Sequence, residues 1–383
     1  MGPDLLPPLS LYVHLPWCER KCPYCDFNSH ERAVIPEREY VGALLNDFAR
    51  ETRDETRPIQ TVFFGGGTPS LFSAEAIHTL LHGLRERAAF AENCEITLEA
   101  NPGSTDNSKL AGFVDAGVNR FSLGIQSFND DRLKALGRIH DSDTAQRAID
   151  AALASGAQTY NVDLMHGLPG QSESQGISDV AAAIELNAPH ISWYQLTIEK
   201  NTQFYSSPPI LPAEDTLATI EADGAERLRA AGYHRYEVSA WAKPGEECRH
   251  NLNYWRFGDY LGIGAGAHGK VTSEDGVIGR YSKTRKPEDY LASEGTTRRG
   301  WRELDREDRI GEFMLGALRL TDGFALETFE ERTGISATAL DTTLQALEAK
   351  GLLERKHNVV RTTPLGSRYL DDVINAFFEA GNE

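Results

Sequence analysis

The feature that most constrains the fold of this chain is a regular alternation of short β-rich runs with longer helical patterns. Six runs read as strands, at residues 11–15, 61–64, 95–98, 120–125, 160–165 and 191–196. Helical spacing falls between them, at residues 37–53, 74–89, 108–116, 142–155 and 174–186. A repeated strand–helix unit with right-handed crossovers predicts a parallel sheet, which is either open and doubly wound or closed into an incomplete barrel.

The pattern changes after the sixth run. A helix is expected at residues 213–231 and a strand at 236–241. From residue 305 the chain reads as helices followed by a small hairpin, at residues 307–318, 326–333, 338–350, 352–355 and 359–362. Because 383 residues exceed one ordinary core of roughly 100–200 residues, we expect two domains. They would be a core over 1–245 and a winged-helix-like domain over 305–383, joined by a connecting segment over 246–304.

Composition and charge exclude several classes of partner. Lys and Arg number 39 against 57 Asp and Glu, a net charge of −18 that disfavours phosphate backbones and anionic lipid. The C-terminal segment is also acidic, which disfavours a DNA-binding role for its winged-helix-like pattern. No apolar run approaches the roughly 18 residues of a membrane span, and the N-terminus lacks the pattern of a secretory signal. We therefore expect a cytoplasmic protein whose partners are proteins or small molecules, with no nucleic acid.

Three of the five cysteines, Cys18, Cys22 and Cys25, are crowded together, while Cys94 and Cys248 stand apart. Their spacing differs from the paired Cys-x2-Cys pattern of a closed zinc site. An iron–sulfur cubane normally takes four cysteines, so a cubane held by three has one iron open to a small ligand. The spacing therefore predicts a [4Fe–4S] cluster that binds S-adenosylmethionine (SAM), whose one-electron reduction yields a 5′-deoxyadenosyl radical.

Glycines and polar side chains follow the predicted strands, where parallel α/β folds gather their ligands. The run 65–67 consists of glycine and lets backbone groups approach a ligand closely. Glu99 and Gln126 end the third and fourth strands, and Asp163 lies in the fifth. These residues are candidates for contacts with SAM. The competing interpretation of each is structural, a turn for the glycines and an ordinary polar side chain for the others.

Several segments together resemble the oxygen-independent coproporphyrinogen III oxidase family of radical SAM proteins: LYVHLPWCERKCPYCDFNSH, GGGTPS, LEANPGS, GIQSFND and DLMHGLPGQ. The resemblance spans nearly the whole chain. It implies an α/β fold, a partial (β/α)6 TIM-like barrel followed by a small, mainly helical winged-helix-like C-terminal domain. It also implies SAM-binding positions at Tyr12, Tyr24, Gly66, Gly67, Thr68, Glu99, Gln126, Arg138 and Asp163.

Two departures from the oxidases redirect the expected function. The oxidases carry a further cysteine two residues past the third, where this chain has Phe27. We also expect no counterpart of the long extension that precedes the cluster in the oxidases. The segment RHNLNYW, residues 249–255, instead resembles the His-Asn-x-x-Tyr-Trp motif of the radical SAM haem chaperones, relatives that bind haem and deliver it to respiratory enzymes.

We therefore expect a haem chaperone without coproporphyrinogen oxidase activity. Oxidative decarboxylation of coproporphyrinogen III is the competing enzyme hypothesis, and a redox-sensing DNA-binding regulator is a minor third. The resemblance further implies three partners besides haem itself: an electron donor, haem-accepting respiratory proteins, some of them at the membrane surface, and a second copy of the chain in a homodimer.

The second motif suits a macrocycle. His250 can donate an imidazole nitrogen to haem iron, and Tyr254 and Trp255 offer flat apolar faces that would stack on the porphyrin. The competing interpretation is a packed aromatic cluster around a hydrogen-bonded histidine. Cys248 is an alternative thiolate ligand, although a lone cysteine is more often buried and inert. The glycine-rich stretch 260–269 that follows permits close approach of backbone to a ligand and lacks the Lys of a P-loop.

Overall fold

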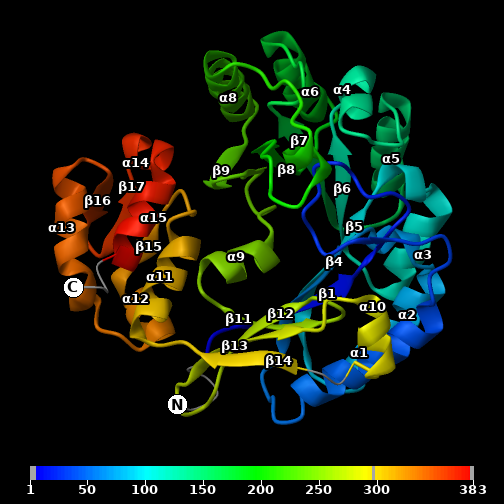
Figure 1. The fold of residues 1–383 in the computed structure, drawn as a ribbon, viewed down its shortest axis with the longest axis horizontal. Helices are drawn as coiled ribbons and strands as arrows, with labels where there is room; N and C mark the ends of the chain where they lie inside the picture. Colours follow the sequence, from blue (N-terminus) through cyan, green and yellow to red (C-terminus); the bar gives the residue numbers. More distant parts are fainter. Residues whose placement is uncertain (1–5, 296–297, 380–383) are drawn as a thin grey trace.

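The computed structural model describes residues 6–295 and 298–379, so the outermost residues of both predicted terminal domains lie outside the described residues. Six parallel strands curve side by side around a central space, with helices on the outside (Figure 1). These strands are β1 (Leu9–Leu15), β4 (Ile59–Gly66), β5 (Phe90–Ala100), β6 (Arg120–Gln126), β7 (Thr159–His166) and β8 (His190–Gln195). The predicted parallel sheet is therefore confirmed.

The outer helices include the six predicted ones, which lie close to their predicted positions, and two short helices that were not predicted, α4 and α7. They are α1 (Glu37–Glu51), α2 (Ala74–Arg85), α3 (Asn107–Ala116), α4 (Asp130–Ala135), α5 (Ser142–Ala154), α6 (Glu173–Glu185), α7 (Gln203–Ser206) and α8 (Glu214–Ala230). The Ser73 side chain accepts a hydrogen bond from the backbone of Ala76 and starts α2, and Ser172 with Gln175 forms a capping box on α6. Gly117 ends α3 in the left-handed region, with φ 112°.

The strands bury different side chains on their two faces, since successive residues of a strand point in opposite directions. On β6 the outward residues Phe121, Leu123 and Ile125 join the hydrophobic core beneath the helices. The inward residues Ser122 and Gln126 line the central space instead. A polar lining of this kind leaves the interior of the half-barrel open for a ligand.

The sheet continues on both sides of these six strands, which the sequence patterns did not indicate. Strand β11 pairs in parallel with β1, and β12, β13 and β14 extend that edge in antiparallel order. The segment expected to connect two domains thus contributes to the twelve-stranded sheet. Its elements are α9 (Arg249–Trp255), β11 (Asp259–Ile263), β12 (His268–Thr272), β13 (Ile278–Lys283), α10 (Pro287–Ala292) and β14 (Arg298–Glu303). At the far edge β9 (His234–Glu237) and β10 (Ala240–Ala242) replace one predicted strand, and β2 (Trp17–Cys18) pairs with β3 (His30–Glu31) apart from the sheet.

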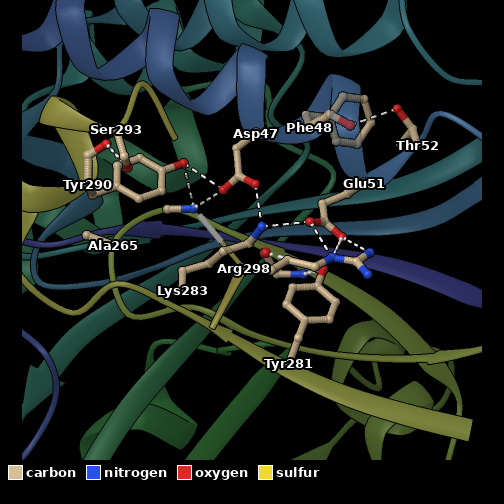
Figure 2. A network of polar contacts seen from close by, with 12 residues as sticks. Asp47, Phe48, Glu51, Thr52, Ala265, Tyr281, Lys283, Tyr290, Ser293 and Arg298 are labelled. Carbon is tan, nitrogen blue, oxygen red and sulfur yellow. Dashed lines mark hydrogen bonds and ion pairs between the residues drawn. The ribbon is translucent and has the colours of Figure 1, made fainter. Parts of the chain in front are cut away.

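A buried network of charges fastens this extension to the first helix of the barrel (Figure 2). The Lys283 ammonium of β13 donates to Asp47 and, at 2.7 Å, to Glu51, both on α1. Arg298 of β14 donates its Nε to Glu51 at 2.9 Å, and the Tyr290 hydroxyl of α10 donates to Asp47 at 2.7 Å. Because the two carboxylates and the Lys283 ammonium are almost fully buried, each depends on the others for its charge compensation.

The C-terminal domain follows the predicted order of helices and hairpin and adds two helices at its end. Its elements are α11 (Arg306–Ala317), β15 (Phe324–Ala325), α12 (Leu326–Thr333), α13 (Asp341–Ala349), β16 (Leu353–Lys356), β17 (Val359–Thr362), α14 (Pro364–Arg368) and α15 (Leu370–Glu379). The domain packs beside β11–β13 and α9 (Figure 1), and its core includes Phe257, Ile278 and Leu304 from the sheet side. Within the described part of the chain, no helix is long and apolar enough to cross a membrane.

Candidate functional site

The three clustered cysteines lie after β1, Cys18 at the end of β2 and Cys22 and Cys25 on the loop that joins β2 to β3. Cys18 is buried and Cys22 and Cys25 are half-buried, and all three are free thiols. The Cys25 amide donates to the Cys22 carbonyl at 3.1 Å, which makes the turn, and the Thr68 hydroxyl donates to the Cys18 sulfur at 3.6 Å. Among the described residues, no three His, Cys, Asp or Glu side chains converge on one metal ion.

A cavity of about 930 Å³ opens from this loop into the half-barrel. It is lined by every cysteine, SAM-binding and haem-binding candidate of the sequence analysis. They are Tyr12, Cys18, Cys22, Tyr24, Cys25, Gly66, Gly67, Thr68, Glu99, Gln126, Arg138, Asp163, His250, Tyr254 and Trp255. Residues far apart in the sequence therefore share one space, of a size typical for a small-molecule site.

The glycine run at the end of β4 is needed for close packing against the end of β1. A Cβ on Gly66, whose φ is 121°, would lie 2.7 Å from the His14 ring. A Cβ on Gly67 would lie 2.5 Å from the carbonyl oxygen of Trp17. The Gly66 amide donates to the Glu99 carboxylate at 3.2 Å, so the run also orients a side chain of the cavity.

Two carboxyl groups, those of Glu99 and Asp163, face the cavity, and neither makes an ion pair with a described residue. Burial, and then the neighbouring Asp163, raise the pKa of Glu99 to about 8. Burial also raises the pKa of Asp163, although Ser122 and Asn161 donate to its oxygens at 3.1 and 2.7 Å. A pair of buried carboxyl groups favours a cationic ligand, because a positive charge between them offsets their desolvation.

Hydrogen bonds between side chains connect Cys18, through Thr68 and Asn101, to Arg138. Asn101 donates its Nδ2 to the Thr68 hydroxyl at 3.0 Å and accepts from Arg138 at 3.2 Å. The Nε of Arg138 is buried without a partner among the described residues. Gln126, at φ 68°, accepts from the Tyr194 hydroxyl at 2.9 Å. Asn101 and Tyr194 were not among the sequence candidates.

At the amino end of β6 the cavity contains Arg120, another residue that the sequence analysis did not identify. Arg120 starts β6 with its side chain facing inward, and its Nε and one Nη are buried with no partner among the described residues. It stands two residues before Ser122 and six before Gln126. The period of two along β6 was the signal that could have placed all three on the inner face.

The second motif forms helix α9, which is anchored inside the barrel. The Glu95 carboxylate of β5 accepts the backbone amides of Arg249 and His250, each at 3.0 Å. The His250 Nδ1 lies 2.7 Å from the Thr61 hydroxyl and its Nε2 lies 3.1 Å from the Tyr254 hydroxyl. Burial lowers the pKa of His250 to about 3, so the ring is neutral. Its role as an iron ligand stays a prediction, and here both ring nitrogens contact protein groups.

Cys248, the alternative thiolate, is buried beside the same carboxylate. Its sulfur lies 3.6 Å from Glu95, and burial raises the pKa of its thiol to about 12. A cysteine binds a metal as the thiolate, so a thiol that is protonated and hydrogen-bonded in this way is a poor metal ligand.

Models of known families match both parts of the chain. The Radical SAM superfamily matches residues 12–180, and the HemN C-terminal domain matches residues 304–369. The solved structure of coproporphyrinogen III oxidase (HemN) from Escherichia coli has a TM-score of 0.82 at 21% sequence identity, over 98% of this chain and 91% of the oxidase. The predicted radical SAM fold with its C-terminal domain is confirmed by these matches.

Relatives of known name match over nearly their full length. The heme chaperone HemW of Haemophilus influenzae is 46% identical over 378 residues, which cover 97% of this chain and 98% of the relative. The heme chaperone HemW of Escherichia coli is 47% identical over 374 residues, with the same shares covered. The heme chaperone HemW of Bacillus subtilis is 34% identical over 379 residues. The chain therefore belongs to the radical SAM superfamily and, within it, to the HemW family.

Proposed function

We propose that this protein is a haem chaperone that binds haem and transfers it to respiratory haemoproteins. The observation that carries the proposal is the identity of 46–47% to two proteins named heme chaperone HemW over 97% of the chain. Such identity spans both the cavity of the barrel and the C-terminal domain. Haem is here the cargo of the protein.

The resident cofactors of the proposal are a [4Fe–4S] cluster and SAM, as the superfamily implies. Cys18, Cys22 and Cys25 would hold the cluster, since their free thiols face one cavity and lie close together in the sequence. Once bound, cluster and SAM together supply one-electron chemistry. The residues around them would bind SAM, with Glu99 and Asp163 offering negative charge to its cationic groups.

Phe27 favours the chaperone over the competing oxidase. It stands where the oxidases carry a further cysteine, and 64% of its side chain is exposed at the rim of the cavity. The structural likeness to the oxidase HemN, at 21% identity, supports the fold alone. Oxidative decarboxylation of coproporphyrinogen III thus remains the alternative to test.

One pair of assays separates these functions. After anaerobic reconstitution of the cluster, haem is titrated while the Soret band is followed, and coproporphyrinogen III is offered in parallel with SAM and a reductant. We expect a saturable Soret change and no decarboxylated product. Formation of the decarboxylated product would overturn the chaperone proposal.

The ligands of the cluster are tested by exchange of single cysteines. We expect Cys22→Ser to lose the [4Fe–4S] absorbance and Cys94→Ser to keep it, because Cys94 lies buried in the barrel core away from the loop. A Cys22→Ser protein with the full cluster absorbance would contradict the assignment.

The partners of the proposal are an electron donor and haem-accepting respiratory proteins. The proposal also includes a homodimer whose formation depends on the cluster. Light scattering of the protein before and after cluster reconstitution tests the dimer, with twice the monomer mass expected only after reconstitution.

A further inference from the structure

A second cavity, of about 650 Å³, adjoins the first, and none of the three cluster cysteines lines it. It lies between the sheet extension, the end of the cysteine loop and helix α11 of the C-terminal domain. The two cavities share part of their walls, and three of the shared residues are SAM-binding candidates. The shared residues are Tyr12, Phe27, Gly66, Glu99, Tyr254 and Trp255. Its volume falls within the roughly 300–1,000 Å³ of small-molecule sites.

One wall of this second cavity is aromatic, and polar and charged side chains line the rest. Phe257 and Tyr260 continue the aromatic surface of Tyr254, whose ring meets that of Tyr260 edge-on at 4.5 Å between centroids. Two apolar side chains stand exposed at its rim, Phe27 from the cysteine loop at 64% and Leu315 from α11 at 52%. Exposed apolar groups at a concave rim favour a large, flat apolar ligand.

One histidine of this cavity is available to a metal. His268, the first residue of β12, is exposed, and its ring makes no hydrogen bond with any side chain or backbone group that the structure describes. His14, in contrast, has its Nδ1 3.1 Å from the Tyr12 hydroxyl and its Nε2 2.9 Å from the Asn28 carbonyl. The nitrogens of His250 are engaged as described above. His268 belongs to the glycine-rich stretch 260–269, for which the first cavity gives no use.

Two arginines, Arg280 and Arg285, line the same cavity as His268. Arg280 pairs with Glu312 and donates to the Tyr260 hydroxyl at 2.6 Å. Arg285, exposed on the rim, has no ion pair among the described residues. Burial, followed by the charges of these two arginines, lowers the pKa of His268, so its ring is neutral and its lone pair free at neutral pH. A positive rim beside an aromatic wall suits a flat ligand with carboxylate substituents.

We propose that haem binds in this second cavity, with the His268 imidazole as an axial iron ligand and Arg285 paired with a propionate. The inference rests on the proposed chaperone function and deepens it by assigning the cargo a site that adjoins the SAM site, with His268 and Arg285 outside the first cavity. Tyr254 and Trp255 then face the macrocycle, and His250 acts as a positioning residue that holds the Tyr254 hydroxyl.

The iron ligand is tested by haem titration of the cluster-loaded protein. We expect His268→Ala to lose the absorbance and paramagnetic-resonance signature of histidine-ligated haem and to bind haem about tenfold more weakly or worse. Added imidazole should restore the signature, because it can occupy the space that the side chain leaves. His78→Ala is the matched control, an exposed histidine on the outer face of α2 that should change neither property.

The propionate contact is tested with two forms of the ligand. Arg285→Ala should weaken binding of haem but not of haem dimethyl ester, whose propionates carry no charge. Lys286→Ala, which removes the next exposed cation outside the cavity, should leave both affinities unchanged. Equal binding of haem by wild type and Arg285→Ala would overturn this contact.

The outcomes separate this inference from the function on which it rests. If the wild-type protein binds no haem, both fail. If it binds haem and His268→Ala gives the same spectrum and affinity, only the second-cavity site is overturned. Loss of the histidine signature in His250→Ala alone, with the variant still folded, would move the iron to the second motif.

Discussion

At the scale of single residues, the electrostatics of the first cavity set the expected pH dependence of SAM binding. Glu99, with its pKa near 8, is mostly protonated at neutral pH in the empty cavity. A cationic ligand stabilises the ionised carboxylate, so binding releases a proton, and the affinity should rise with pH between about 6 and 8. In Glu99→Gln this part of the dependence should vanish, while the titration of SAM itself is common to both proteins. Calorimetry at three pH values measures it, and identical slopes for both proteins would contradict the assignment.

His250 marks the limit of residue-level prediction from sequence. The motif placed His250, Tyr254 and Trp255 together correctly, since α9 brings them to one cavity. It could not show whether the ring nitrogens were available, because that depends on Thr61, a residue distant in the sequence. Whether a histidine nitrogen is free to bind a metal therefore depends on hydrogen bonds to residues that are distant in the sequence.

The same contacts predict the effect of removing the His250 side chain. His250→Ala removes the ring's contacts with the half-buried Tyr254 hydroxyl and with the buried Thr61 hydroxyl, which keeps its hydrogen bond to Ser10. We expect the free energy of unfolding to fall by about 2 kcal/mol. Tyr254→Phe, which removes one contact only, should cost about half as much. Denaturant unfolding measures both, and wild-type stability of His250→Ala would rule out the anchoring role.

At the scale of elements, sequence periodicity located the repeated strands and helices but not the sheet extension. Strands β4 and β6 alternate buried core residues with cavity residues between strong turn signals, so their positions were predictable. Strand β14, RRGWRE, is charged and short, and β12 is Gly- and Lys-containing, so neither carries an apolar period. Their place is fixed by pairing with neighbours, which local patterns do not encode.

Buried ion pairs hold the sheet extension (β11–β14) to α1, and the loss of Lys283 should have a measurable effect on stability. Lys283→Met leaves Asp47 and Glu51 buried without their shared cation, which should cost about 3–5 kcal/mol of unfolding free energy. Burial already raises the pKa of Asp47 to about 6, against the pull of Lys283. Without Lys283 the carboxyl is better tolerated protonated, so the loss should be larger at pH 8 than at pH 5. Lys286→Met, at an exposed neighbour, should lie within about 0.5 kcal/mol of wild type at both pH values.

At the scale of the whole molecule, the hydrophobic core of the C-terminal domain includes side chains from the barrel side, while the barrel has a separate core beneath its helices. Phe257, after α9, meets Phe313 of α11 edge-on at 5.8 Å between ring centroids, and Ile278 of β13 joins the same cluster. These contacts also close the second cavity, whose walls come from both parts. Two parts that are joined in this way should unfold together, because separating them exposes apolar side chains of both.

Hydrogen exchange can measure this cooperativity, because it reports separately on the C-terminal domain and on the barrel. Phe329 is fully buried within the C-terminal domain, and Phe329→Ala should remove about 3–5 kcal/mol. If unfolding is shared, hydrogen exchange by global opening should accelerate equally in β17 and in the central barrel strand β4. Phe378→Ala, at a side chain 42% exposed, should change both far less. Acceleration confined to β17, with β4 at its wild-type rate, would show that the domains open separately and that the second cavity forms only while they are docked.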